Sequence, residues 1–368
     1  MKKTIWKNLA SAAAVLAGIS LLVTVCLDAS DLGPKGVEYK RMVILGKVVK
    51  GSPSRVSVFV TETFDFEDRQ IPRAITGAQV VMMDDSGRSV SLDPGDPGIY
   101  QLEIPDNDPG FQLEVGRSYH LKVTTEKGKQ YISSPEPLLD VPEAAALEVG
   151  KITKLEPDAI GGYSPVDYLS FEVTTPLVVS GAAERARLRW EVEETYKLTD
   201  TPINGAEPKT CYLTVAQNAS AVRIFNGTEL FSDELPGYPV YETAPNYRFH
   251  EGYYLNLIQE SLSSGAYEYW RQTQELLNRT GSMFESPVGK VQSNFRSLDD
   301  ETEDVFGYFY ATRQDTIRLY VRPEIAGSPP SLCPPSVPAG GRPCPIAVCC
   351  NCLDQANSST AKPWYWIE

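Results

Sequence analysis

Short runs of alternating apolar and polar residues recur along this chain and restrict it to few kinds of fold. In SRVSVFVTET, for example, Val56, Val58 and Val60 occupy every second position. Successive side chains of a β-strand point to opposite faces, so this spacing places the three valines on one face. A similar run, RMVILGKVV, precedes it. The pattern predicts a mainly β, essentially all-β protein.

The same pattern continues as far as residue 141 and predicts a first domain over residues 39–141. The segment ITGAQVVMMDDSGRSVSL predicts two strands joined by an Asp-Ser-Gly turn, and GIYQLEI and SYHLKVTTEKGKQYISS add further strands. Short strands separated by Gly, Pro and Asp turns are typical of a small β-sandwich. The Asp-rich loops 93–98 and 106–110 leave calcium binding open. Turn chemistry is the favoured explanation, because neither loop contains a full ligand set.

A second predicted domain comprises residues 142–368. The boundary lies in the stretch SPEPLLDVPEAAALEVG, where the strand pattern is weaker. In ARLRWEVEETYKLT, alternation resumes, with Leu188, Trp190 and Val192 on one face and charged residues, including Arg189 and Glu191, on the other. The segment DVFGYFYATRQDTIRLYVRP predicts two strands joined by a turn at residues 313–315. We therefore expect a second β-sandwich-like domain.

One segment, SSGAYEYWRQTQELLNRTG, has the periodicity of a helix. It predicts an amphipathic helix over about residues 263–280, ended by Gly281. Trp270 lies within the apolar stripe, so a packed core position is favoured over a ligand platform. The stripe comprises Ala266, Tyr269, Trp270, Thr273 and Leu277.

The N-terminus, MKKTIWKNLASAAAVLAGISLLVTVCLDAS, has the layout of a bacterial export signal. A basic segment is followed by an apolar run from Leu9 to Val25 and then by Cys26. This order predicts a lipoprotein signal peptide over residues 1–25, lipidation of Cys26, and a tether over residues 26–38. Val25 departs from the small residue usual at that position. Two or more acyl chains, palmitate among them, would hold the protein stably on a bilayer.

The charge of the chain argues against nucleic-acid binding. The formal net charge is −14, and removal of the three lysines of the signal peptide makes it −17. Phosphate backbones are bound by clustered Lys and Arg, and the sequence contains no such patch. It also contains no glycine-rich Walker loop for a nucleotide. We expect neither nucleic acid nor nucleotide as a partner, and no cofactor.

Six cysteines remain after Cys26, and an even number in an exported protein favours disulfides. A zinc site is less favoured, because the tail has a single C-x-x-C and the two histidines, His120 and His250, lie far from it. A redox motif is also less favoured in a Pro-rich tail. A local bridge could join Cys333 to Cys344, and any bridge from Cys211 would tie the tail to the middle of the chain. The six candidates are Cys211, Cys333, Cys344, Cys349, Cys350 and Cys352, with the Cys-rich tail spanning residues 333–368.

Several blocks of the sequence, in their order, resemble one family. They are ITGAQVVMMDDSGRSVSL, YYLNLIQESLSSGAYEYWRQTQELLNRTGSMFESP, VFGYFYATRQDTIRLYV and CCNCLDQANSSTAKPWYW. Together they resemble the Bacteroidota lipoproteins known as domain of unknown function 4249, over about residues 40–368. The resemblance implies an immunoglobulin-like, prealbumin-like first domain. It also implies an outer-membrane anchor on the cell-surface side and a gene often encoded beside those of TonB-dependent receptors, but no established activity.

Signals for catalysis are weak in this sequence. It has no G-x-S-x-G or H-E-x-x-H motif, and its two histidines lie far apart. A carboxylate pair for glycoside hydrolysis stays open, because many acidic residues are present. We expect a non-catalytic binding or accessory module that assists a TonB-dependent transporter. The alternative is a structural or adhesive envelope protein without a small-molecule ligand. The segments YPVYETAPNYRF and PWYW are candidate contact surfaces, although packing is their favoured role.

The lipidation hypothesis makes a direct prediction. We expect the Cys26→Ser variant to be released from membranes or to remain unprocessed, because it lacks the thiol that would carry the lipid. Separation of soluble and outer-membrane fractions, followed by blotting, measures this. A variant that stays in the outer membrane as the wild type does would rule out Cys26 as the anchor.

Overall fold

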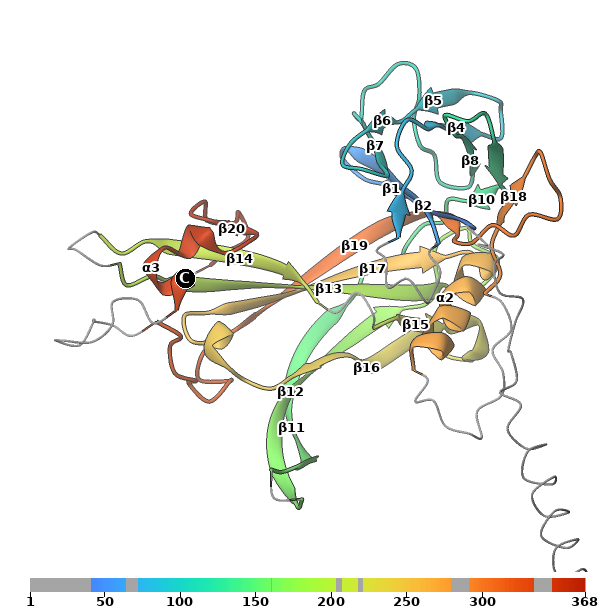
Figure 1. Cartoon of the computed structure of the whole chain (residues 1–368). Helices are drawn as coiled ribbons and strands as arrows, with labels where there is room; N and C mark the ends of the chain where they lie inside the picture. Colours follow the sequence, from blue (N-terminus) through green and yellow to red (C-terminus); the bar gives the residue numbers. More distant parts are fainter. Residues whose placement is uncertain are drawn as a thin grey trace, which may run out of the picture. The chain divides into compact units, whose positions relative to one another are not determined.

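The computed structural model describes residues 41–63, 72–159, 161–202, 207–217, 221–278, 291–333 and 346–367. Within these ranges the protein is mainly β, with one long helix (Figure 1). The predicted signal peptide and tether, with Cys26, and also Cys344 lie outside the described residues. In the part of the chain that is described, no helix has the length and apolar character needed to cross a membrane.

The first ten strands form most of a β-sandwich. The strands are β1 Met42–Lys50, β2 Ser54–Glu62, β3 Arg73–Ala74, β4 Gln79–Asp84, β5 Ser89–Ser91, β6 Asp93–Pro94, β7 Ile99–Ile104, β8 Ser118–Thr124, β9 Gln130–Ser133 and β10 Glu136–Pro137. Strands β1, β2, β7 and β6 are consecutive in one sheet, and β9, β8, β4 and β5 are consecutive in another. Val56, Val58 and Val60 are buried, as their spacing predicted, in a cluster that includes Met82 and Leu121 of the other sheet.

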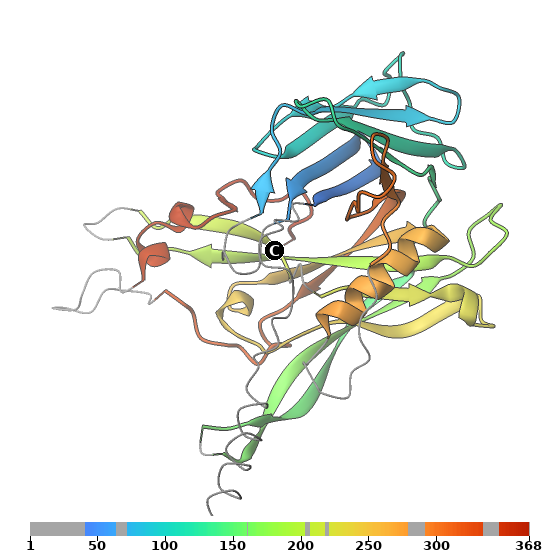
Figure 2. The same ribbon diagram turned by 45° about the vertical axis from the view of Figure 1, so that its right-hand side comes forward.

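The remaining strands extend both of these sheets and build a third. They are β11 Ala146–Pro157, β12 Tyr163–Pro176, β13 Arg187–Thr199, β14 Thr210–Ala216, β15 Arg223–Asn226, β16 Glu234–Thr243, β17 Tyr253–Leu262, β18 Phe295–Ser297, β19 Phe309–Val321 and β20 Ser358–Ser359. Strands β11, β12 and β16 form a three-stranded sheet. Phe171 of β12 packs with Trp190 of β13 and Leu255 of β17 in a second buried cluster. Figure 2 shows this sheet diverging from the large one. The predicted mainly β, sandwich-type fold is confirmed.

Strands from the two predicted domains pair with each other. Strand β1 lies between β2 and β19, and it pairs with β19 in parallel, from Gly46 opposite Phe309 to Lys50 opposite Arg313. Strand β18 adds to the edge of β9. The first sandwich therefore includes strands that follow it by more than a hundred residues in sequence. The division near residue 142 stays a prediction.

Strand β19 runs unbroken through residues 313–315, so the predicted turn there is wrong. Asp315 pairs with Gln259 of β17, and Arg313 pairs with Lys50 of β1. Backbone hydrogen bonds to strands on both sides hold these polar residues extended, and tertiary pairing outweighs their turn preference.

Helix α2, Ser264–Leu277, confirms the predicted amphipathic helix. The Ser263 hydroxyl caps its first turn by accepting a hydrogen bond from the Ala266 amide. The helix ends at Leu277, which is about half exposed, so the buried stripe is shorter than predicted. Gly281 lies outside the described residues. The remaining helices are short: α3 Ala347–Cys350 and the 3-10 turns η2 Gly227–Glu229, η3 Tyr247–Phe249 and η4 Cys352–Asp354.

One disulfide attaches the C-terminal tail to strand β14, and another closes a loop within the tail. Cys211 of β14 is bonded to Cys352, and Cys333 is bonded to Cys349. Cys350 is disulfide-bonded as well. The disulfide prediction is confirmed for the two pairs, but the suggested local bridge from Cys333 to Cys344 is wrong, because Cys333 is bonded to Cys349 instead.

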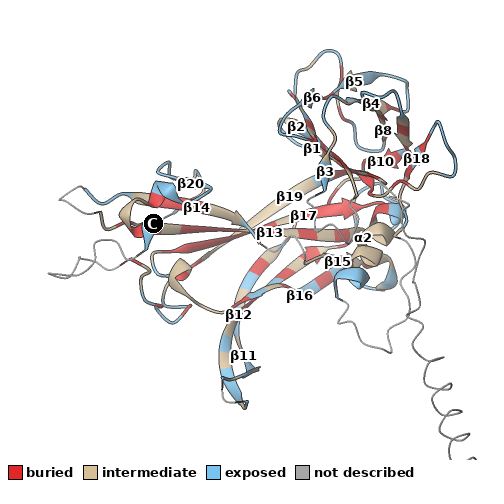
Figure 3. Cartoon of the chain, in the orientation of Figure 1, coloured by how far each residue is buried: buried red, intermediate tan, exposed pale blue. Residues whose placement is uncertain are grey.

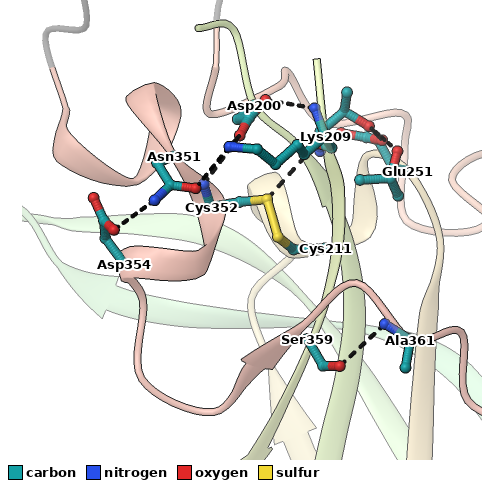
Figure 4. Close-up of a disulfide and its surroundings, with 11 residues drawn as sticks. Asp200, Lys209, Cys211, Glu251, Asn351, Cys352, Asp354, Ser359 and Ala361 are labelled. Atoms are coloured by element: carbon teal, nitrogen blue, oxygen red, sulfur yellow. Dashed lines mark hydrogen bonds and ion pairs between the residues drawn. A yellow bond between two sulfur atoms is a disulfide. The ribbon is translucent and has the colours of Figure 1, made fainter. Parts of the chain in front are cut away.

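Hydrogen bonds around the Cys211–Cys352 bridge also tie the tail to the connection between β13 and β14 (Figure 4). The Asp200 carboxylate accepts hydrogen bonds from the amides of Lys209 and Cys352, at 2.7 and 3.2 Å. The Lys209 ammonium donates to the Asn351 side chain at 3.0 Å. The two bonded cysteines are 141 residues apart in sequence, and closing such a loop stabilises by about 5 kcal/mol in the chain-entropy model.

We expect all six candidate cysteines to resist alkylation in the denatured, unreduced protein, which mass measurement detects. Reduction should lower the thermal midpoint, because loss of a native bridge costs about 2–5 kcal/mol in small exported domains. A chelator should leave the midpoint unchanged, since a structural zinc would contribute folding free energy of its own. The Cys211→Ser/Cys352→Ser double variant should reproduce part of the effect of reduction. Six alkylated cysteines together with bound zinc would contradict this prediction.

Candidate functional site

A cleft of about 270 Å³ lies where the face of the large sheet meets helix α2. Alternation along the strands explains which side chains face it. Ile44 and Val48 of β1 are buried in the sandwich core, whereas Leu45 and Lys47 line the cleft. The full lining is Leu45, Gly46, Lys47, Ser57, Phe59, Arg189, Glu191, Tyr269, Trp270, Tyr308 and Tyr310.

The Glu260 carboxylate of β17, which contacts the lining residues Lys47, Arg189 and Tyr310, has no exposure to solvent (0%). It accepts hydrogen bonds from Arg189 Nη1 at 2.9 Å, Tyr310 Oη at 3.2 Å and Gln314 Nε2 at 2.6 Å. It also forms an ion pair with the Lys47 ammonium of β1. A buried carboxylate needs such partners, because the loss of hydration is costly unless charges and hydrogen bonds replace it.

Glu191 of β13 completes the network. Its carboxylate lies 2.6 Å from Arg189 Nη1 and 3.2 Å from Lys47 Nζ. Lys47 and Arg189 are therefore balanced by Glu191 and Glu260, and the network, which we call the charge network, is neutral as a whole. It joins β1 to β13 and β17, strands from the two predicted domains.

Three groups at the cleft, Glu191, Lys47 and Tyr310, keep their protonation states across neutral pH. Burial acts to raise the pKa of Glu191, but the adjacent charges of Lys47 and Arg189 lower it to about 2. Burial acts to lower the pKa of Lys47, but Tyr310, Glu260 and Glu191 raise it above its usual value. Burial, reinforced by Glu260, raises the pKa of Tyr310. A general acid or base works best with a pKa near the working pH, and these three groups do not have one.

An aromatic wall, formed by Tyr269 and Trp270 of α2 together with Tyr308 and Tyr310, borders the charge network. The Arg189 guanidinium carbon lies 4.1 Å from the centre of the Trp270 ring, a cation–π contact. Tyr269 lies 5.0 Å from Tyr308, and Trp270 meets Tyr310 edge-on at 6.2 Å. Trp270 Nε1 and Arg189 Nε are buried, and no hydrogen-bond partner for either occurs in the described ranges. Trp270 is half-buried: it packs against the cluster beneath α2, but it also borders the cleft and is less buried than the predicted core position.

Glu136 of β10 supports this wall from behind. Its carboxyl accepts hydrogen bonds from Ser263 Oγ and Tyr308 Oη, both at 2.5 Å. Burial raises the pKa of Glu136, against the effect of these hydrogen bonds. The contact fixes Tyr308 and the first turn of α2 to the first sandwich.

The structure places the residues singled out from the sequence in different regions. The described cysteines lie around β14 and the tail, and neither histidine lines the cleft. In the loop 106–110, Asp108 Oδ1 accepts from the amides of Gly110 and Phe111, which is turn chemistry. Among the described residues, no group of three or more His, Cys, Asp or Glu side chains is arranged to hold a metal ion.

The two aromatic segments proposed as contact surfaces mostly pack within the protein. Tyr238 of β16 stacks on Trp190 with ring centres 5.2 Å apart. In the tail, Trp366 is buried against Tyr212 and Tyr254, whereas Trp364 is exposed beside Arg318. Packing was the favoured role for both segments.

Two of the four charged residues of the network, Lys47 and Glu260, were not predicted from the sequence. Arg189 and Glu191 were on the charged face of a predicted strand, but nothing marked that face as covered. Lys47 was one polar residue in an apolar strand. Glu260, in YYLNLIQESL, was an isolated carboxylate within an apolar run, and that is the signal that could have found it.

Comparison with family models identifies the chain. A model described as domain of unknown function (DUF4249) matches residues 31–318. The chain belongs to the DUF4249 family. No curated protein matches the sequence. The description of the family names no activity.

We expect Glu260→Gln to destabilise the protein by about 3 kcal/mol, the low end of the range for breaking a buried ion pair, because Glu191 remains as a partner for both cations. Urea unfolding measures the change. Glu103→Gln is the matched control. Glu103 pairs with Arg55 at 3.0 Å on the exposed surface, and its loss should change stability by less than about 0.5 kcal/mol. Equal effects of the two substitutions would show that the charge network does not stabilise the fold.

Proposed function

We propose that this DUF4249 protein is a non-catalytic binding or accessory module, anchored by acylated Cys26 in the outer membrane of a Bacteroidota cell, on the surface side. Its binding site is the cleft beside α2, and its partner is a TonB-dependent transporter. The observation that carries the binding role is the combination of a closed, neutral charge network with half-exposed apolar side chains at one cleft. The N-terminal sequence supports the anchor.

The cleft favours binding over catalysis for a chemical reason. Lys47, Glu191 and Tyr310 keep fixed protonation states at neutral pH, and Lys47 and Arg189 are engaged by Glu191 and Glu260. Such groups position a ligand but do not exchange protons with it. Leu45 and Phe59, 38% and 39% exposed, offer apolar area of the kind that ligand sites use.

The alternative is an adhesive or structural envelope protein, and the hairpin of β11 and β12 favours it. From Leu169 onward, β12 pairs with β11 on one side and with β16 on the other. Between the turn and Leu169, β12 pairs with β11. Figure 3 shows this outer part of the hairpin as largely exposed. Leu155 and Tyr163 are 70% and 71% exposed there. A protruding ribbon with exposed apolar side chains suits contact with a second surface.

Co-purification from native outer membranes separates the two proposals. We expect the wild-type protein to bring down a TonB-dependent receptor in about equal amount, identified by mass spectrometry. Phe59→Ala should reduce this recovery, because it removes apolar area from the cleft that holds the ligand shared by the two proteins. Phe231→Ala, at a fully exposed position outside the cleft lining, is the control and should not. A protein that emerges alone would favour the adhesive alternative, and equal recovery with Phe59→Ala would move the binding site away from the cleft.

A further inference from the structure

The open floor of the cleft presents an apolar pair beside a polar pair. In the antiparallel register of β1 and β2, Leu45 lies opposite Phe59, and Lys47 lies opposite Ser57. All four line the cleft. Directly opposite residues have neighbouring side chains, so the two pairs form adjacent patches on one face. A ligand lying on this floor would contact an apolar patch and, next to it, a row of hydrogen-bonding groups.

The charge network argues that this ligand is uncharged. An anion approaching Lys47 or Arg189 would compete with Glu191 and Glu260, which already hold both cations. A cation approaching Glu191 or Glu260 would be repelled by Lys47 and Arg189, which lie next to both carboxylates. The chain as a whole carries −14, which further disfavours an acidic ligand at long range. A neutral ligand disturbs none of these pairs.

The floor also disfavours an extended peptide. Strand β1 is paired on one side with β19 and on the other with β2, and β2 is paired with β1 and β7. Peptides bound by strand addition need an unpaired strand edge, whose amides and carbonyls supply the affinity. The cleft instead offers side chains that can both donate and accept. Glu191 accepts, Lys47 donates, and the Ser57 hydroxyl does both.

The wall of the cleft adds unused donors. Trp270 Nε1 and Arg189 Nε are both buried, with no protein partner in the described part of the chain. A buried donor without a partner costs about 1–3 kcal/mol. A ligand reaches these atoms only by shifting the Trp270 ring, and a ligand rich in hydroxyl oxygens would then supply the missing acceptors.

We propose that the cleft binds a neutral carbohydrate, with the apolar face of a sugar ring on Leu45 and Phe59 and its hydroxyls on Lys47, Ser57 and Glu191. This proposal rests on the binding function proposed above and names the ligand class of that site. A sugar ring combines a C–H face with an edge of hydroxyls that both donate and accept. That combination matches the apolar pair, the polar pair and the neutral network, and the oxygen-rich edge suits the unused donors of Arg189 and Trp270.

The test is binding of the full-length, detergent-purified protein to an array of neutral and acidic oligosaccharides, followed by titration of the best neutral ligand. We expect neutral glycans to bind, with a change in tryptophan fluorescence as the Trp270 ring shifts. Phe59→Ala should weaken binding at least tenfold, whereas Phe231→Ala should bind as the wild type does. Trp270→Phe keeps an aromatic wall but lacks the indole N–H, and it should abolish most of the fluorescence change.

Other outcomes overturn the proposal. These are preferential binding of acidic glycans, binding of a peptide pool with no glycan bound, no binding at all, or equal glycan binding by the Phe59→Ala variant. If no oligosaccharide on the array binds but recovery of a receptor depends on Phe59, the carbohydrate proposal is wrong and the proposed accessory function is retained. Glycan binding without any receptor would remove the partner and leave the ligand class.

Discussion

Glu260 is a carboxylate with no access to water, so its charge has to be stabilised by protein groups. The arrangement of strands around it supplies those groups. Its partners come from β1, β13 and β19, so the charge is stable only when strands from both predicted domains are in place. A buried charge left without its partner is strongly destabilising. The parallel pairing of β1 with β19, which brings Lys47 beside Tyr310, is the backbone feature that makes this possible.

The cleft is a consequence of the same junction. Helix α2 packs over the end of the large sheet through Ala266, Tyr269 and Trp270. The neighbouring face of β1 and β2 has Leu45 and Phe59 partly exposed. Glu136 joins β10 to the cap of α2 and to Tyr308, so the wall of the cleft is fixed to the sandwich that forms its floor. Groups held in this way suit recognition, because little side-chain freedom is lost when a ligand binds.

Local patterns in the sequence were sufficient to predict the main strands and the helix. They were insufficient to predict the residues of the cleft. Val56, Val58 and Val60 were assigned to the core and are buried there, and α2 was found from its periodicity. The turn placed at residues 313–315 was wrong, because the ladders of β1 and β17 on either side of β19 determine its conformation. Arg189 and Glu191 were assigned to a charged face. Whether that face is covered depends on α2 and β1, which follow or precede β13 by many residues.

The sequence alone determined the strand periodicity, the helix and the even set of cysteines, because each is written in neighbouring residues or in composition. The tertiary structure decided which strands pair, which cysteines bond and which charges meet. Cys333 bonds to Cys349, and Lys47 reaches Glu260 across more than two hundred residues of sequence. The physical reason is that alternation within a strand fixes which face of the sheet a side chain lies on. Its neighbours on that face depend on which strands pair and in what register, and the pattern of a single strand does not contain that information.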